Sequence, residues 1–193
     1  MLEFIEKEGF SCDRQSKYDF TASTINYIIQ TTENKDIEIV FKEFDENGKL
    51  IPFDSDKSST TSDSDLVMFY NNHPYLIELK ERKGIYTSEF YGKEGDKEGW
   101  MLNIKKEKDL QNQKWAIPLY VNLFPDGIIR LWNLNKIKIN KDKKLEKNIN
   151  EYTVAVSEKK KQKRYEVWNK DSKVIQRVKG HPSNGIWTSQ GTN

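Results

Sequence analysis

Two short apolar stretches, 66–70 and 75–79, stand on either side of a polar segment near the middle of the chain. Side chains of a strand point alternately to its two faces, so such stretches can build a core with one face and a site with the other. The segment 71–74, Asn-Asn-His-Pro, carries turn chemistry, because Asn tolerates unusual φ values and Pro fixes its own. The pattern predicts a β-hairpin over 66–80.

The faces of this hairpin depend on its register. If Tyr70 pairs with Tyr75, antiparallel pairing places Asp65 opposite Lys80, on the same face as Glu78. A slip of one residue would move Asp65 to the other face and bury its charge. The opposite face is then apolar and suited to a core, and it consists of Leu66, Met68, Tyr70, Tyr75, Ile77 and Leu79.

The remaining pattern mixes helices and strands. The Thr-, Ile- and Tyr-rich run 18–32 and the alternating run 36–44 predict two paired strands. A helical stripe predicts a helix over 100–115, followed by buried strands at 117–124 and 128–134. Weaker candidates are a short helix at 2–8 and strands at 151–156 and 165–168. This order predicts an α/β (α+β) fold, a central mixed sheet flanked by helices, with extra β elements at the C-terminus.

The length of 193 residues predicts one domain with appendages. We expect the core over residues 1–135, including a flexible loop at 54–63 that contains no apolar residue. A basic, β-rich extension over 136–179 is expected to pack on this core. The polar residues 180–193 are expected to form a loose tail.

Composition limits the compartment and the kind of metal site. No apolar run approaches the roughly 18 residues of a membrane span, and the first residues lack the basic and apolar regions of a signal peptide. The lone cysteine, Cys12, fits a reducing compartment. With two histidines and one cysteine, a zinc site is improbable. We therefore expect a cytoplasmic protein without a membrane partner, in which oxygen atoms hold any metal.

The net charge of +2 hides a strong asymmetry. Residues 1–66 contain 15 acidic and 7 basic residues, net −8, whereas residues 136–193 contain 15 basic and 6 acidic residues, net +9. A basic part of this kind can meet a polyanion such as DNA, although a Lys-rich composition explains it equally well. The residues expected to contact phosphate are Lys159, Lys160, Lys161, Lys163 and Arg164.

Two carboxylates and an ammonium group on one rigid face can hold a divalent metal beside a phosphodiester. Asp65, Glu78 and Lys80 make such a set, and their arrangement resembles the PD-(D/E)xK nuclease superfamily with its restriction-endonuclease-like fold. There an Asp begins one strand of a hairpin and a Glu-x-Lys ends the next. Ser64 stands where that superfamily usually has Pro. By element order the resemblance extends over roughly residues 60 to 135.

This resemblance implies Mg²⁺ or Mn²⁺ as the cofactor, held by Asp65, Glu78 and the backbone carbonyl of Leu79. It implies that Lys80 holds the attacking water or stabilises the charge of the transition state. It also implies a further ligand from an N-terminal helix, for which Glu6 is the candidate. The function expected from it is metal-dependent hydrolysis of DNA by an endo- or exodeoxyribonuclease.

Several alternatives stay open at the level of sequence. Asp19 begins a second run of β-forming residues and could replace Asp65 as the ligand, while Lys106 and Gln113 of the predicted helix could face the site. Charged residues make up 32% of the chain, so an Asp followed by Glu-x-Lys can arise by chance. The other function classes are a catalytically silent nucleic-acid-binding or protein-interaction module on the same fold, and an assembly protein that forms homo-oligomers through its acidic and basic halves.

Overall fold

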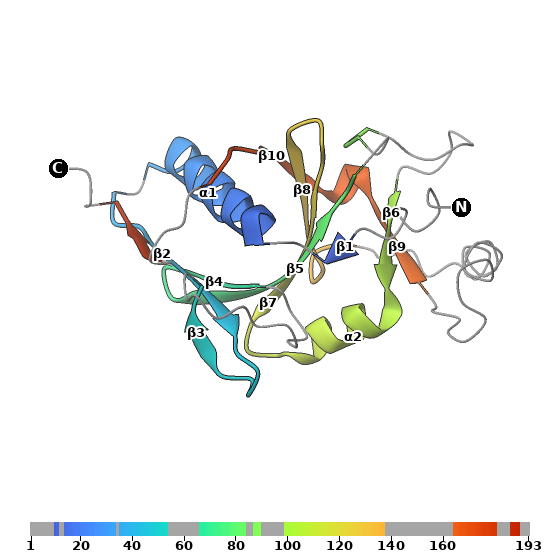
Figure 1. The fold of residues 1–193 in the computed structure, drawn as a ribbon, viewed down its shortest axis with the longest axis horizontal. Helices are drawn as coiled ribbons and strands as arrows, with labels where there is room; N and C mark the ends of the chain where they lie inside the picture. The colour runs from blue at the N-terminus through green and yellow to red at the C-terminus, as the bar shows by residue number, and fades with distance from the viewer. Residues whose placement is uncertain are drawn as a thin grey trace.

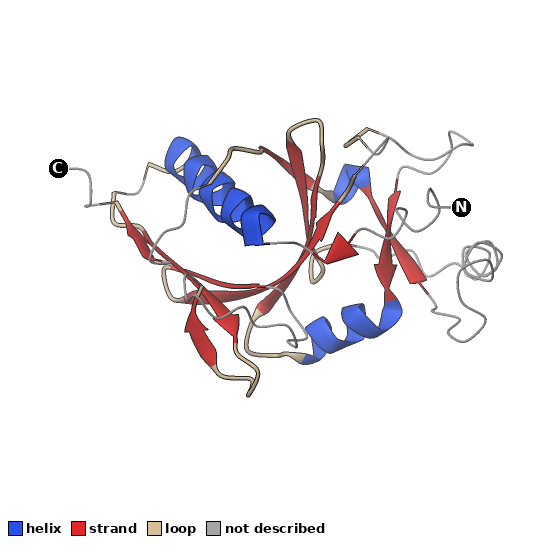
Figure 2. Cartoon of the chain, in the orientation of Figure 1, coloured by secondary structure: helices blue, strands red, loops and turns tan. Residues whose placement is uncertain are grey.

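The structure, a computed structural model, describes residues 10–11, 14–33, 35–53, 66–83, 87–89, 99–137, 164–180 and 186–189. They form a central mixed sheet with helices on both of its faces (Figures 1 and 2). The elements, in chain order, are β1 (Phe10–Ser11), α1 (Arg14–Thr31), β2 (Glu38–Phe44), β3 (Leu50–Pro52), β4 (Leu66–Tyr70), β5 (His73–Glu81), β6 (Gly99–Asn103), α2 (Ile104–Asn112), β7 (Ile117–Leu123), β8 (Ile128–Asn133), β9 (Arg164–Trp168), the 3₁₀ helix η2 (Asn169–Asp171), β10 (Lys173–Gln176) and β11 (Ile186–Thr188). Neither described α-helix combines the length and apolarity needed to cross a membrane.

The main sheet has the strand order β10-β8-β7-β5-β4-β2-β11. β5 and β7 are parallel and are joined by the crossover that contains α2, whereas the other neighbours in this order are antiparallel. β1 pairs with the end of β5, β3 pairs with β2, and β6 and β9 form a separate two-stranded ribbon. The predicted mixed sheet flanked by helices is confirmed.

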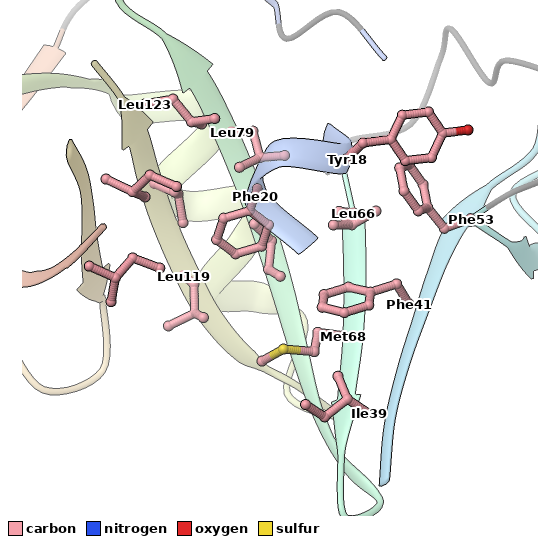
Figure 3. Close-up of a cluster of buried hydrophobic side chains, with 14 of the residues drawn as sticks. Tyr18, Phe20, Ile39, Phe41, Phe53, Leu66, Met68, Leu79, Leu119 and Leu123 are labelled. Carbon is pink, nitrogen blue, oxygen red and sulfur yellow. The ribbon is translucent and has the colours of Figure 1, made fainter. Parts of the chain in front are cut away.

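Two hydrophobic cores lie on the two faces of the sheet. Phe20 of α1 is fully buried among Leu79, Leu119 and Leu123 of the strands below it (Figure 3). The second core lies under α2 and the β6–β9 ribbon and includes Val67, Leu76, Trp100, Leu102, Leu110, Tyr120, Trp132 and Val167. The central strands β4, β5, β7 and β8 therefore contribute side chains to both cores, and the direction of any side chain on β5 decides which layer it meets.

The strand expected over 18–32 is wrong, because this segment is the helix α1. Its Thr, Ile and Tyr residues favour strands only weakly, and burial against a neighbouring surface overrides such preferences. Phe20, Thr21 and Thr24 are buried along the helix against the sheet. The alternating pattern of 36–44 is confirmed as β2, but its partners are β3, β4 and β11.

The helix expected over 100–115 begins later and ends earlier than predicted. Trp100 and Leu102 are both buried, and this alternation belongs to strand β6. The side chain of Asn103 then caps α2 by accepting hydrogen bonds from the backbone N–H groups of Lys105 and Lys106, at 2.8 and 3.4 Å. Because this cap fixes where α2 begins, it also fixes the position of Lys106.

The central hairpin is confirmed, with a different register. Asn71 and Asn72 both have positive φ, 45° and 64°, and form a two-residue turn. Tyr70 therefore pairs with His73 instead of Tyr75, and Leu66 pairs with Ile77. The register differs from the predicted one by two residues, which leaves every side chain on its predicted face. The expected apolar face consequently lies in the core beneath α1.

The other predicted elements fall into three groups. The strands expected at 117–124, 128–134 and 165–168 are confirmed as β7, β8 and β9. The tail expected to be loose over 180–193 is wrong at 186–188, since β11 pairs with β2 at the edge of the sheet. The helix at 2–8, the loop at 54–63 and the strand at 151–156 lie outside the described residues.

A clamp of charged and polar groups ties the segment after β10 to α1. Arg177 donates to the carboxylates of Asp19, at 2.9 and 3.1 Å, and Glu81, at 3.2 Å. The second oxygen of Asp19 accepts from the backbone N–H of Gly180 at 3.0 Å and from Gln15 at 2.9 Å. Burial opposes the ionisation of Asp19, but the hydrogen bonds from Gln15, Gly180 and Arg177 together hold its pKa below the ordinary value.

This lowered pKa predicts that the clamp weakens in acid. A group whose pKa is lower in the folded protein stabilises it above the unfolded pKa, and the contribution disappears as pH falls through the folded pKa. We expect Asp19→Asn to be less stable than the wild type at pH 7, with the difference shrinking below about pH 4. Thermal unfolding measured from pH 7 to pH 2 checks this, with Glu46→Gln as an exposed control. A difference in stability that stays constant over this range would contradict the role of the Asp19 charge.

Candidate active site

Glu78 lies in the middle of β5 on the face covered by α2, and only 1% of it is exposed. Lys80 of the same strand places its Nζ 2.7 Å from Oε1 of Glu78, and Lys106 of α2 places its Nζ 3.2 Å from Oε2. The side chains of the two lysines are 23% and 33% exposed. A buried carboxylate is thus held between two lysines whose side chains are partly exposed.

The sequence explains this meeting of three side chains. Glu78 and Lys80 are two residues apart on one strand and therefore share a face, as predicted. The Asn103 cap places Lys106 in the first turn of α2, where the helix dipole disfavours a cation. The carboxylate of Glu78 offsets that cost. Helix propensity alone does not explain a lysine at position 106, so the ion pair between Lys106 and Glu78 points to a role for these two residues.

A row of buried polar groups continues from Glu78 along β5 and onto β7. Arg82, which is 2% exposed, donates from Nε to Oδ1 of Asn122 at 2.9 Å and from Nη2 to the hydroxyl of Tyr120 at 2.9 Å. Its guanidinium carbon also lies 5.1 Å from the centre of the Trp100 ring, within range of a cation–π interaction. Arg82 is therefore fixed in place beside Lys80.

Glu78 is the buried carboxylate of this site, and the ammonium groups of Lys80 and Lys106 lie against its two oxygens. Neither oxygen of Glu78 accepts a hydrogen bond of regular geometry from the residues that the structure describes. A buried charged group of this kind is costly, and replacing buried ion pairs by apolar residues is often neutral or stabilising. The cluster is poorly explained by stability and is suited to hold a cation against Glu78 and an anion against the lysines.

Of the residues predicted to bind metal, Glu78 lies in this site. Leu79, predicted to contribute its backbone carbonyl, follows Glu78 on β5, and its side chain lies in the core beneath α1. Asp65 and Glu6 lie outside the described residues. So do the basic residues Lys159, Lys160, Lys161 and Lys163. Arg164 begins β9 and pairs through its backbone with Asn103, the residue that caps α2. The end of the predicted basic segment therefore lies beside the helix that carries Lys106.

The alternative ligand Asp19 is wrong for a site at Glu78. Asp19 lies on α1 and is bridged by Arg177 to Glu81, which points to the opposite face of β5 from Glu78. Lys106 does face Glu78, as one of the open alternatives expected. Gln113 lies at the end of α2, where its side chain accepts a hydrogen bond from Trp115 at 3.1 Å.

Sequence reasoning missed Arg82, Tyr120 and Asn122. Two signals were present. Arg82 is two residues beyond Lys80 and so shares its face, and Asn122 is an amide within the otherwise apolar run 117–124. The sequence pattern does not reveal that β7 is the neighbour of β5. This parallel pairing depends on the crossover through α2, which is part of the tertiary structure.

Within the described ranges, no three His, Cys, Asp or Glu side chains come together as a metal site. Comparison with models of known protein families, with curated proteins and with solved structures finds no match for this chain. The geometry around Glu78 is therefore the basis from which a function is inferred.

Proposed function

We propose that the protein is a metal-dependent nuclease that hydrolyses phosphodiester bonds of DNA, with Glu78 and Lys80 in its active site. The observation that carries this proposal is the fully buried carboxylate of Glu78, held by Lys80 and Lys106 on a central strand. Replacing a buried ion-pair cluster by apolar residues is often neutral or stabilising, and this cluster provides the groups that phosphodiester hydrolysis needs.

The arrangement of elements supports the same proposal. With the short strands β3 and β6 left aside, the elements follow the order helix, three strands, helix, strand, and they are α1, β2, β4, β5, α2 and β7. β5 and β7 are parallel. The Glu-x-Lys motif lies on the third of these strands, and Leu66, which directly follows Asp65 in the sequence, pairs with Ile77 beside Glu78. This is the order expected from the resemblance to the PD-(D/E)xK superfamily, and we extend the proposal to its restriction-endonuclease-like fold.

The donor set around Glu78 fits a hard divalent cation. Mg²⁺ binds oxygen and uses only one or two protein carboxylates, keeping waters and substrate phosphate as its other ligands. Glu78 supplies one carboxylate without a regular hydrogen bond, and Asp65 and the Leu79 carbonyl are the expected further ligands. When bound, Mg²⁺ or Mn²⁺ would polarise the phosphate and lower the pKa of a coordinated water. Glu78 would hold the cation, leaving Lys80 to act on the substrate.

The lysines give the site its preference for an anion. Lys80 is expected to stabilise the charge that develops on the phosphate, because a fixed cation acts best where charge appears. Lys106, at the N-terminal end of α2, adds a second positive charge together with the helix dipole. Arg164 pairs through its backbone with Asn103 at the same end of the helix, and the expected phosphate contacts of the basic residues 159–164 stay part of the proposal.

A non-catalytic DNA-binding module is the second candidate. It is favoured by the ion pairs that satisfy the charge of Glu78 without a metal, and by the lack of a third carboxylate near Glu78 within the described residues. Both functions predict DNA binding, so only chemistry separates them.

The proposal is tested by incubating the purified chain with supercoiled plasmid and with end-labelled linear duplex. Reactions contain Mg²⁺, Mn²⁺ or EDTA. We expect cleavage with either metal and none with EDTA. Binding of the duplex without cleavage under every metal condition would favour the non-catalytic module.

A further inference from the structure

Asn122 of β7 carries a buried hydrogen-bond donor for which the described residues provide no acceptor. The residue is fully buried, and its Oδ1 accepts from Nε of Arg82. Among the described residues, nothing accepts a hydrogen bond from its Nδ2. Leaving a buried donor unpaired costs free energy, so such a group calls for an explanation through a ligand or a catalytic role.

The orientation of this amide is fixed by its neighbours. A guanidinium group only donates, so the oxygen of the amide must face Arg82 and the nitrogen must turn away from it. Arg82 itself cannot swing aside easily, because it also donates to the Tyr120 hydroxyl and stacks against Trp100. Asn122 is therefore held ready as a donor, which lowers the entropy cost of binding an acceptor.

The position of Asn122 indicates what that acceptor is. Asn122 pairs with Lys80 across the parallel strands β5 and β7, and its side chain lies on the face that carries Glu78. Neighbouring strands are about 4.8 Å apart, so the backbones of Asn122 and Lys80 are neighbours and their side chains leave the sheet on the same face. A neutral donor beside an ammonium group suits an oxygen that carries negative charge, and it disfavours a cation.

We propose that Nδ2 of Asn122 donates a hydrogen bond to a non-bridging oxygen of the DNA phosphate bound at Lys80, with Arg82 as the residue that positions it. This inference rests on the proposed function, because it places the phosphate at the Glu78–Lys80 site. It adds a substrate contact from β7, a strand that carries none of the residues Asp65, Glu78 and Lys80.

A purely structural role for Asn122 predicts different mutant behaviour. Asn122→Asp keeps an oxygen for Arg82 but removes the donor, whereas Asn122→Ala removes both. If Asn122 only holds Arg82, Asn122→Asp should keep the thermal stability of the wild type and Asn122→Ala should lose stability. The new negative charge would then be the only cause of weaker DNA binding, so the loss of binding should be confined to Asn122→Asp. If Asn122 binds phosphate, both variants should lose affinity for DNA, and Asn122→Asp should do so without losing thermal stability.

The experiment measures the binding of a short labelled DNA duplex by three proteins: Glu78→Gln alone, and Glu78→Gln combined with Asn122→Asp or with Asn122→Ala. The thermal unfolding of each protein is measured in parallel. We expect each Asn122 substitution to weaken binding by about 10- to 100-fold, the range for a hydrogen bond to a charged group. Cleavage by the single variants should show a higher KM. Unchanged binding in both double variants would overturn the inference, and so would a loss confined to Asn122→Asp, which would indicate charge repulsion instead of a lost donor.

The outcomes also separate this inference from the proposed function. If the wild type cleaves DNA and the Asn122 variants bind and cleave as it does, the inference alone fails. If the wild type does not cleave but the Asn122 substitutions weaken binding, the nuclease proposal fails and the phosphate contact stands. A Glu78→Gln protein that binds no DNA overturns the inference.

Discussion

Replacing Glu78 by Gln is expected to lower the rate of metal-dependent DNA cleavage by about 10²- to 10³-fold, the usual effect of removing one preorganised charged group from a transition state. Gln has the shape of Glu but no charge to hold a divalent cation. The fold should survive, because the partly exposed side chains of Lys80 and Lys106 can turn toward water when the ion pairs are lost. The measurement is single-turnover cleavage of a labelled duplex at saturating Mg²⁺.

The chain offers a matched control for this substitution. Glu43 of β2 is also a fully buried carboxylate held by two cations, Arg14 at 3.1 Å and Lys17 at 3.4 Å, but it faces the α1 side of the sheet. Glu43→Gln should cost stability and leave the cleavage rate of the folded protein unchanged. Equal cleavage by the wild type and the Glu78 variant would indicate a contaminating nuclease and would remove Glu78 from the mechanism.

The second large effect is expected at Gly180, where substitution by Ala should destabilise the protein by about 1–3 kcal/mol. A Cβ at this position would lie 2.2 Å from the backbone oxygen of Tyr18 and 3.1 Å from Cβ of Ala22, both on α1. Helix backbone cannot yield as a flexible side chain can, so the segment after β10 must move away from α1. That movement would also stretch the hydrogen bonds that join Gly180 to Asp19 and Gln15.

Thermal unfolding of Gly180→Ala measures this effect. For a chain of this size, a loss of 1 kcal/mol corresponds to a fall in Tm of about 2–4 °C. Lys179→Ala is the control, because Lys179 is the exposed neighbour of Gly180. A Gly180→Ala protein as stable as this control would mean that the chain after β10 does not pack on α1 as described.

The sequence predicts the faces of the central hairpin correctly and its register incorrectly, and the two outcomes have different physical causes. The faces depend only on alternation, which a shift by two residues preserves. The register depends on the turn, and two consecutive Asn residues with positive φ close a shorter turn than the four residues expected. Glu78 and Lys80 could therefore be placed on one face without knowing which residues lie opposite them.

Tertiary contacts determine the features that the sequence did not predict. The segment that forms α1 contains many β-branched and aromatic residues, and it is helical because its buried side chains pack onto the sheet. Asn122 reaches the site because the crossover through α2 places β7 beside β5. The sequence allowed Lys106 to be proposed as facing the site. Its exact position depends on the Asn103 cap, which fixes where α2 begins and so places the ammonium group of Lys106 at Glu78.

Anomalous scattering from a crystal soaked with Mn²⁺ tests the metal site most directly. The account predicts one strong peak about 2.1 Å from a carboxylate oxygen of Glu78, with Asp65 as a second ligand and Lys80 displaced from the carboxylate. The same soak of a Glu78→Gln crystal should show no peak there. Mn²⁺ bound only elsewhere, with Lys80 and Lys106 still paired to Glu78, would contradict a metal-dependent active site at this position.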